Sequence, residues 1–183
     1  VASTVTDIAL RHKRIDILVN SAGVNAERRR LDVLSADAWE NVISINLSGT
    51  FYCCHAVMPS MRTQGGGVIV NISSWAGRYP TQFTGSAYNA SKRAVIALTE
   101  SINMEECIHG IRATAVLPEE VATPLLDRRP CPPSQKVRAR MLQPGDLART
   151  IRFIAALPHS VCVNEMTISP TWNRSYLGGL DSI

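Results

Sequence analysis

Short, strongly apolar runs alternate along the chain with longer stretches in which apolar residues recur every three or four positions. The short runs are rich in valine and isoleucine and lie at residues 15–19, 68–72, 111–116 and 161–168. The longer stretches have helical spacing and lie at residues 2–13, 36–61, 87–107 and 144–157. Apolar strands that alternate with helices are typical of a parallel sheet covered on both sides. The expected fold class is therefore α/β, a doubly wound, Rossmann-like parallel sheet.

The chain is expected to form a single domain over residues 1–183. Residues 117–143 differ from the rest because they are rich in proline and arginine. A loop of that length in a compact domain is usually functional or disordered. Because this segment follows the carboxyl end of a predicted strand, where open α/β sheets bind ligands, we interpret it as a substrate lid. The alternative is a passive surface loop.

Composition and charge narrow the range of partners. The formal net charge is +4, and 45% of the residues are hydrophobic, which is ordinary for a globular protein. The run Arg28, Arg29 and Arg30 is shorter than basic patches that bind nucleic acid, so we interpret it as a solvated loop, with a phosphate contact as the alternative. No apolar run reaches transmembrane length, and the five cysteines show no metal-ligand spacing. We therefore expect a cytoplasmic protein that binds no nucleic acid, membrane or metal.

Tyr88 and Lys92 are the strongest candidates for catalytic chemistry. They lie four residues apart on a predicted helix, so their side chains share one face. A tyrosine with a pKa of about 10 is a poor acid or base at neutral pH, but a nearby ammonium stabilises the phenolate and lowers that pKa. This spacing predicts a general acid/base. The alternative is a surface pair on an ordinary amphipathic helix.

Two strand ends carry further candidates. Ser73 and Ser74 end the apolar strand that precedes Tyr88, which places a hydroxyl in the ligand crevice at the carboxyl end of the sheet. Asn20 and Gly23 follow the first predicted strand, where small residues let the backbone approach a flat ligand closely. A plain strand-ending turn explains this second group equally well.

Asn46 is a polar residue in an otherwise apolar predicted helix. An asparagine there lowers the helix propensity, so a special role is indicated. The alternative is an asparagine that faces solvent.

Taken in order, these features resemble the short-chain dehydrogenase/reductase family. The ordered set is Asn-x-Ala-Gly from Asn20, the mid-helix Asn46, Ser-Ser-x-Ala-Gly from Ser73, Tyr-x-x-x-Lys from Tyr88 and Pro-x-x-Val-x-Thr-Pro from Pro118. The match covers nearly all of the chain, and the motifs are highly specific together. The resemblance implies an NAD(P)-dependent oxidoreductase that transfers a hydride between nicotinamide and an alcohol or carbonyl substrate.

The resemblance also implies a role for each matched residue. Tyr88 would be the general acid/base, Ser74 would hold the substrate oxygen, and Lys92 would lower the pKa of Tyr88 and hydrogen-bond the nicotinamide ribose. Asn46 would anchor a water that links Lys92 to bulk solvent. The cofactor-binding residues would be Asn20, Ala22 and Gly23 on the adenosine-ribose side, and Pro118, Val121 and Thr123 at the nicotinamide end.

The chain departs from the family pattern in two places. None of its glycines matches the Gly-x-x-x-Gly-x-Gly turn that cradles the pyrophosphate, and we expect the N-terminal strands of the fold to be absent from this chain. The strand at residues 15–19 would then be an exposed apolar edge. Glu119 stands where the family usually has glycine, so we expect a positive φ there and a carboxylate near an anionic cofactor.

These departures leave open a second hypothesis, a truncated or non-catalytic family member that senses a dinucleotide or binds other proteins. Between NAD and NADP, the NADP form is slightly favoured, although the residues that select between them fall outside the matched motifs. The expected partner is a small-molecule alcohol or carbonyl. By resemblance, the helices at residues 36–61 and 87–107 would pair in a homodimer or homotetramer.

Overall fold

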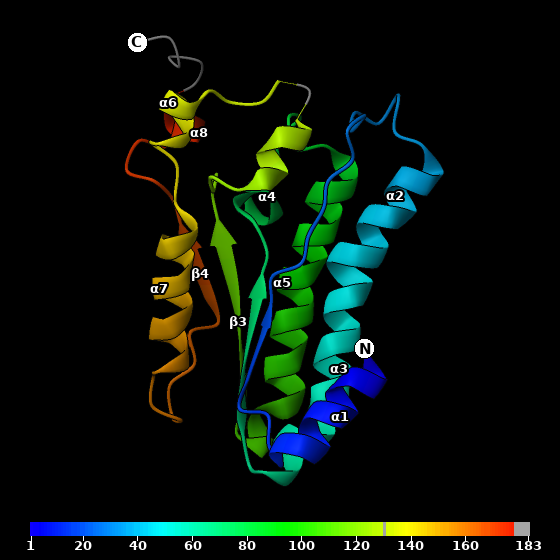
Figure 1. Cartoon of the computed structure of the whole chain (residues 1–183), viewed down its shortest axis with the longest axis vertical. Coiled ribbons are helices and arrows are strands. Elements are labelled where there is room, and N and C mark those ends of the chain that lie inside the picture. The colour runs from blue at the N-terminus through cyan, green and yellow to red at the C-terminus, as the bar shows by residue number, and fades with distance from the viewer. Residues whose placement is uncertain (130, 178–183) are drawn as a thin grey trace.

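In the computed structural model, which describes residues 1–129 and 131–177, four strands form one parallel sheet (Figure 1). The strands are β1 (Ile17–Asn20), β2 (Gly67–Ile72), β3 (Ile111–Pro118) and β4 (Glu165–Ile168). They lie in the order β1-β2-β3-β4, and each neighbouring pair is parallel. The prediction of a Rossmann-like α/β fold is confirmed.

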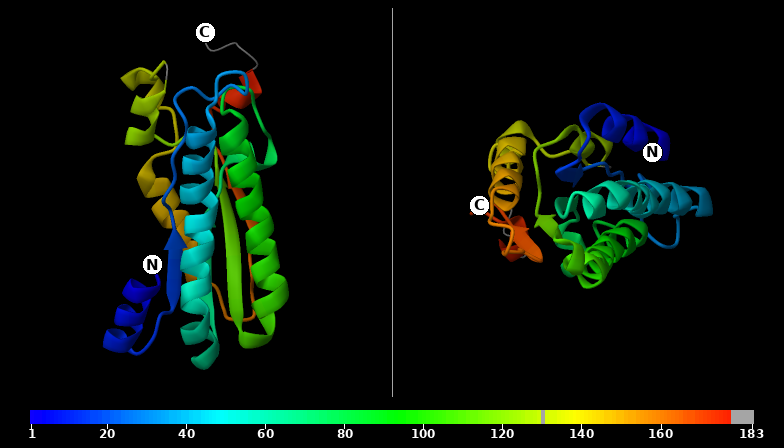
Figure 2. Two further views of the ribbon diagram at one scale, coloured as in Figure 1. Left: turned by 90° about the vertical axis from the view of Figure 1, so that its right-hand side faces the viewer. Right: turned by 90° about the horizontal axis from the view of Figure 1, so that it is seen from below.

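Helices cover both faces of this sheet (Figure 2). Helices α3 (Gly49–Thr63) and α5 (Ser86–Glu106) lie on one face, and α7 (Pro144–Ala155) lies on the other. Helix α1 (Ala2–His12) packs against α3. The remaining helical elements are α2 (Ala36–Ile43), η1 (Ser44–Ser48), α4 (Trp75–Arg78), η2 (Cys107–His109), η3 (Pro124–Arg128), α6 (Gln135–Arg138) and α8 (Arg174–Leu177).

The alternation of side chains along β2 builds a core on each side of the sheet. Ile69 packs with Met61 of α3 on one face, whereas Val68 and Val70 pack with Ile154 of α7 on the other. Successive strand residues point to opposite faces, so a strand covered on both sides needs apolar residues at every position. This requirement explains the uninterrupted apolar runs in the sequence.

The predicted helix over residues 36–61 is interrupted by a π-helical turn. Its residues form α2, the π-helical η1 and then α3, which continues to Thr63. Asn46 lies in η1 and is fully buried. Single π-helical turns inside α-helices are often found at functional sites. The π-helical turn therefore contains Asn46, the polar residue for which the sequence indicated a special role. Because Asn46 is buried, the alternative that it faces solvent is wrong.

The last strand is shorter than predicted, since it begins at Glu165 and not at residue 161. The side chain of Asn103 explains the late start. Its Nδ2 donates to the carbonyl of Ala113 at 2.8 Å, and its Oδ1 accepts from the amide of the same residue at 2.7 Å. The early part of β3 is thus paired with a side chain, and the ladder with β4 begins only at Ala115.

The segment 117–143 is folded against the carboxyl ends of the strands. It contains η3 and α6, and a parallel bridge joins Val121 to Leu142. Leu126 is buried, whereas Pro130 lies outside the described residues. This segment forms one wall of the cavity described below.

Strand β1 lies at one edge of the described sheet, as expected. Ile17 is 48% exposed and Val19 is 39% exposed, so the edge strand presents apolar side chains. Within the described residues, no helix combines the length and the apolarity needed to cross a bilayer.

Candidate active site

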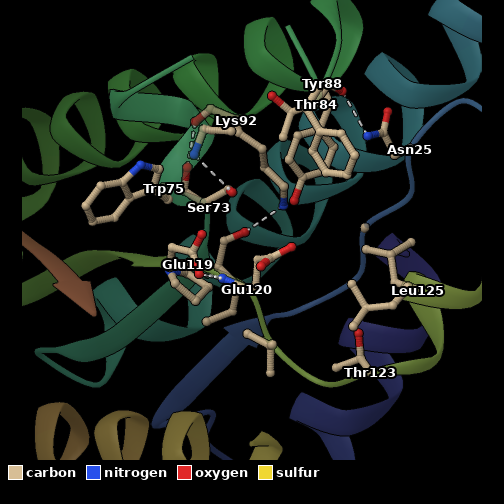
Figure 3. Close-up of a pocket in the computed structure, with 18 of the residues that line it drawn as sticks. Asn25, Ser73, Trp75, Thr84, Tyr88, Lys92, Glu119, Glu120, Thr123 and Leu125 are labelled. Atoms are coloured by element: carbon tan, nitrogen blue, oxygen red, sulfur yellow. Dashed lines mark hydrogen bonds between the residues drawn. The ribbon is translucent and has the colours of Figure 1, made fainter. Parts of the chain in front are cut away.

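A cavity of about 460 Å³ opens at the carboxyl ends of β1, β2 and β3 (Figure 3). Parallel sheets of this type bind ligands at that end of the strands. Its walls come from the loop after β1, the end of β2 with α4 and the loop that follows, the first turns of α5, and the segment after β3, with further residues from α7 and α8. The predicted residues that line it are Gly23, Ser74, Tyr88, Lys92, Pro118, Val121 and Thr123.

Tyr88 lies in the first turn of α5 and points into this cavity (Figure 3). Burial raises the pKa of its phenol. The Ser74 hydroxyl and the positive charges of Arg129 and Arg29 act in the opposite direction on that pKa. The expected net lowering is therefore not met, because desolvation outweighs the groups that favour the phenolate.

The structure distinguishes between the two adjacent serines at the end of β2. The hydroxyl of the buried Ser73 donates to the carbonyl of Lys92 at 2.7 Å, so it ties β2 to α5. Ser74 caps α4, where its Oγ accepts from the amide of Ala76 at 3.2 Å, and it also lies near Tyr88. Ser74 is therefore the serine whose hydroxyl can reach a ligand beside the phenol.

Lys92 lies one helical turn after Tyr88 and is only 4% exposed. Its Nζ donates to the carbonyl of Ile72 at 2.8 Å and lies 5.7 Å from the centroid of the Tyr88 ring. Burial lowers the pKa of this ammonium to about 8. Among the described residues, no carboxylate forms an ion pair with Lys92. The cavity thus holds a desolvated cation beside the phenol.

Asn46 fastens the loop after β1 to α5. Its Oδ1 accepts from the amide of Val24 at 2.8 Å, and its Nδ2 donates to the carbonyl of Val24 at 3.0 Å and to the hydroxyl of Ser91 at 3.1 Å. A Cβ added to Gly23 would lie 3.4 Å from Lys92 Nζ and 3.6 Å from Asn46 Oδ1. Asn46 thereby holds the backbone of this loop close to Lys92.

The other residues expected around the cofactor divide into two groups. Pro118, Val121 and Thr123 line the cavity, as does Gly23. The side chain of Asn20 instead points between the strands, where its Nδ2 donates to Asn71 Oδ1 at 2.8 Å.

Asn71 lies inside the core beside α5, and its Nδ2 donates to the hydroxyl of Thr99 at 3.0 Å. The side chain of Asn20 therefore stabilises the sheet, because the buried amide of Asn71 needs a partner. A cofactor contact at Asn20 stays a prediction and would involve its backbone. Ala22 is exposed next to Gly23.

Glu119 does not have the positive φ that the family resemblance predicted. Lys13 is the one non-glycine residue with a positive φ in the described part of the chain, so no glycine-type conformation is needed at Glu119. Its carboxylate accepts from the amide of Glu120 and from the Ser175 hydroxyl at 3.1 Å. Burial raises the pKa of Glu119, which disfavours its charge at the cavity wall.

Arg29 lines the cavity, although the arginine run was interpreted as a solvated loop and a phosphate contact was only the alternative. Arg28 and Arg30 are exposed, whereas Arg29 is partly buried beside the Phe83 ring. Asn25 closes the same wall, since its Nδ2 donates to the carbonyl of Thr84 at 3.0 Å. The position of the arginine run could have indicated a ligand contact, because the run follows the carboxyl end of β1, where ligands bind.

Gly77 lets α4 approach α5 behind Ser74. A Cβ there would lie 2.8 Å from the carbonyl oxygen of Lys92 and 2.9 Å from Ser73 Oγ. Gly77→Ala is expected to lower the free energy of unfolding by about 1–3 kcal/mol, because the Lys92 carbonyl belongs to the backbone and cannot rotate away from the added Cβ. The measurement is urea unfolding of the complete protein.

The matched control is Gly145→Ala in the first turn of α7, where the nearest atom would be an Arg149 side-chain nitrogen at 3.7 Å. This control should retain or slightly raise stability because alanine favours helix. Equal midpoints for both variants would contradict the steric argument.

The chain is similar to known oxidoreductases over most of its length. The short chain dehydrogenase family model matches residues 1–131. An uncharacterized oxidoreductase of Staphylococcus saprophyticus is 37% identical over 157 residues, which are 86% of this chain and 64% of that protein. The 3-oxoacyl-[acyl-carrier-protein] reductase of Synechocystis sp. is 35% identical over 163 residues, which are 87% of this chain and 64% of the reductase.

A solved structure gives the same result. A metagenomic short-chain oxidoreductase in complex with NADP superposes with a TM-score of 0.76 at 28% sequence identity, covering 94% of this chain and 69% of that one. The chain spans 64% of the length of the Staphylococcus saprophyticus oxidoreductase and of the Synechocystis reductase.

Proposed function

The chain belongs to the short-chain dehydrogenase family, and from this premise we propose that the protein is an NAD(P)-dependent oxidoreductase acting on an alcohol or carbonyl substrate. The observation that carries the proposal is the meeting of Tyr88, Ser74 and Lys92 around one cavity at the carboxyl end of the sheet. A general acid/base, a hydroxyl for the substrate oxygen and a desolvated cation are the groups that carbonyl reduction needs.

The residues around Gly23 fit a dinucleotide. The absence of a side chain leaves a cradle next to Lys92 Nζ and Asn46 Oδ1, which a Cβ would narrow. Lys92, Pro118, Val121 and Thr123 would hold the nicotinamide end, with Thr123 at its carboxamide, and Gly23 would lie on the adenosine-ribose side. When bound, the nicotinamide supplies or accepts the hydride.

In the direction of reduction, Tyr88 would donate its phenolic proton to the carbonyl oxygen of the substrate as a hydride reaches the carbonyl carbon. Ser74 would hold the same oxygen, which fixes the carbonyl beside the phenol. Lys92 would stabilise the resulting phenolate by its charge. Its partly lowered pKa, to about 8, makes Lys92 able to pass a proton, and a water anchored at Asn46 would connect it to solvent.

We propose NADP as the cofactor in preference to NAD. The metagenomic relative in complex with NADP supports a nicotinamide dinucleotide with this fold. We also propose that the segment 117–143 acts as a substrate lid, since it lines the cavity from Pro118 to Arg129. We further propose that the protein is cytoplasmic and forms a homodimer or homotetramer in which α3 and α5 pair with those of another subunit. The exposure of Phe51 on α3 supports such a pairing.

A second candidate function is a non-catalytic family member that senses a dinucleotide. Glu119 favours this alternative, because its carboxylate lies in the cavity wall directly after Pro118 and would oppose an anionic cofactor. Its raised pKa weakens that opposition.

The experiment that separates the two functions is a steady-state assay of the complete protein with NADPH and NADH over a panel of ketones, aldehydes and oxo acids. We expect cofactor oxidation that depends on the carbonyl compound and is faster with NADPH. Binding of NADPH without turnover on any member of the panel would favour the sensor and contradict the enzyme.

A further inference from the structure

Two arginines meet on one aromatic ring at the mouth of the cavity. The Cζ atoms of Arg29 and Arg129 lie 5.9 and 4.9 Å from the centroid of Phe83. Arg29 comes from the loop after β1, and Arg129 comes from the segment after β3. Both side chains line the cavity that contains Tyr88. Distant parts of the chain thus bring two positive charges to one place.

Only one of these two charges is balanced by a described neighbour. Arg129 Nη1 lies 2.5 Å from a carboxylate oxygen of Glu120, and both side chains are largely buried. Arg29 forms no ion pair with any residue that the structure describes. Its Nε is buried and has no hydrogen-bond partner in the same part of the chain. A buried charged donor without an acceptor is costly, so Arg29 calls for an anion.

Electrostatics agree with the geometry. The Arg29 cation is partly buried and lies near the charge of Arg129, and both of these effects lower its pKa. The fields of Arg129 and Arg29 also reach the phenol of Tyr88, where both lower its pKa. The positive region is therefore close to the proposed reacting carbonyl.

We infer that Arg29, supported by Arg129, binds an anionic oxygen group of the substrate, so the preferred substrates are carbonyl compounds that carry a carboxylate or a phosphate near the carbonyl. This inference rests on the proposed function, since it identifies the substrate class of the same site. An arginine binds such a group through an ion pair with two parallel hydrogen bonds, whereas a neutral analogue offers only weaker hydrogen bonds without the ion pair. Glu120 is held by Arg129, and burial disfavours the charge of Glu119, so the nearby carboxylates oppose the anion only weakly.

The experiment compares matched substrate pairs in the complete protein. The pairs are 2-oxobutyrate with 2-oxobutyramide, and dihydroxyacetone phosphate with dihydroxyacetone. The variants are Arg29→Gln, Arg29→Lys and the control Arg28→Gln, which removes the same charge from the neighbouring exposed position. For the preferred anionic substrate, Arg29→Gln should raise KM about 10- to 100-fold, as expected for a lost charged hydrogen bond. The KM of its neutral partner should change less than about threefold.

Two further readouts keep the inference separate from the proposed function. Calorimetric binding of each substrate to Tyr88→Phe and to Tyr88→Phe with Arg29→Gln measures anion preference without turnover. The dissociation constant of NADPH shows whether Arg29 holds the cofactor instead. We expect the anion preference to vanish with Arg29→Gln, to return partly with Arg29→Lys and to persist with Arg28→Gln, while NADPH binding stays unchanged.

Several results would overturn the inference. The inference is rejected if the unmodified protein binds the neutral member of each pair as tightly as the anionic member. This result does not depend on whether Arg29→Gln folds. If Arg28→Gln loses as much of the preference for the anionic substrate as Arg29→Gln does, the preference comes from the overall positive charge of the loop and not from a binding site at Arg29. Weaker NADPH binding in Arg29→Gln with unchanged substrate preference assigns the arginine to the cofactor. Absence of turnover combined with Arg29-dependent anion binding rejects the proposed function and retains the anion site.

Discussion

Tyr88→Phe is expected to lower kcat about 10²- to 10⁴-fold, the range typical for removal of a general acid/base. The substitution removes one oxygen from a side chain that points into the cavity (Figure 3). The hydroxyl interacts with Ser74 inside the cavity and not with the backbone of the described residues, so the free energy of unfolding should change little. The measurement is the initial rate of NADPH oxidation with the best substrate of the carbonyl panel.

The control for this prediction is Tyr52→Phe on α3, where the side chain is 55% exposed and does not line the cavity. It should retain the full rate. Titration of NADPH fluorescence should give the same dissociation constant for Tyr88→Phe as for the unmodified protein. A rate within about threefold of the unmodified protein would reject Tyr88 as the proton donor.

Lys92→Met is expected to abolish most turnover and, at the same time, to stabilise the protein at neutral pH. Burial lowers the pKa of Lys92 from 10.5 to about 8, which corresponds to an unfavourable contribution of about 3 kcal/mol at pH 7. Methionine fills similar space without a charge. It loses the hydrogen bond from Nζ to Ile72, at a cost of about 1 kcal/mol. The melting temperature should therefore rise by several degrees.

The pH dependence of this gain follows from the direction of the shift. Below pH 8 Lys92 is protonated in both the folded and the unfolded protein, so the full cost of burying its charge is present. Between about 8 and 10.5 the folded state releases the proton and that cost falls. The advantage of Lys92→Met should therefore be largest at or below pH 8 and shrink above it.

Differential scanning calorimetry from pH 6 to 10 measures this advantage, and Lys136→Met provides the control. Lys136 is exposed in α6, so its replacement should leave the melting temperature nearly unchanged at every pH. A lower melting temperature for Lys92→Met than for the unmodified protein at pH 7 would contradict this prediction. It would show that the buried ammonium stabilises the fold and does not lower its stability.

The fold could be predicted from the sequence because its signals are local and repeated. The β-branched run around Ile69 and the amphipathic spacing of α5 both follow from burial on known faces. The late start of the last strand could not be predicted, since it depends on hydrogen bonds between the Asn103 side chain and the backbone of Ala113. That contact joins residues ten positions apart across a turn, and no periodicity announces it.

The candidate site could be predicted only where a motif fixes both residue type and spacing. Tyr88, Lys92 and Ser74 meet around the cavity as their motifs indicated. Asn20 belongs to the same motif set but turns into the core, because the buried amide of Asn71 takes its hydrogen bond. Whether a polar side chain at a strand end faces ligand or core depends on its partners across the sheet.

Arg29 could not be singled out within its run for a related reason. Three consecutive arginines in a loop look alike in sequence, and only tertiary packing against Phe83 separates the middle one from Arg28 and Arg30. The raised pKa of Tyr88 was equally unforeseen, since the spacing of Tyr88 and Lys92 carries no information about desolvation of the phenol.

The most direct test of the central claim is the fate of the hydride in a reaction of the complete protein. NADPH that carries deuterium at either face of the nicotinamide C4 is oxidised in ordinary water with the best carbonyl substrate, and the alcohol is analysed by mass spectrometry. A hydride-transferring oxidoreductase predicts one deuterium on the carbinol carbon from one of the two labelled cofactors, with none gained in the Tyr88→Phe reaction beyond its residual turnover. Product alcohol without deuterium from both cofactors, or no alcohol at all, would contradict the assignment.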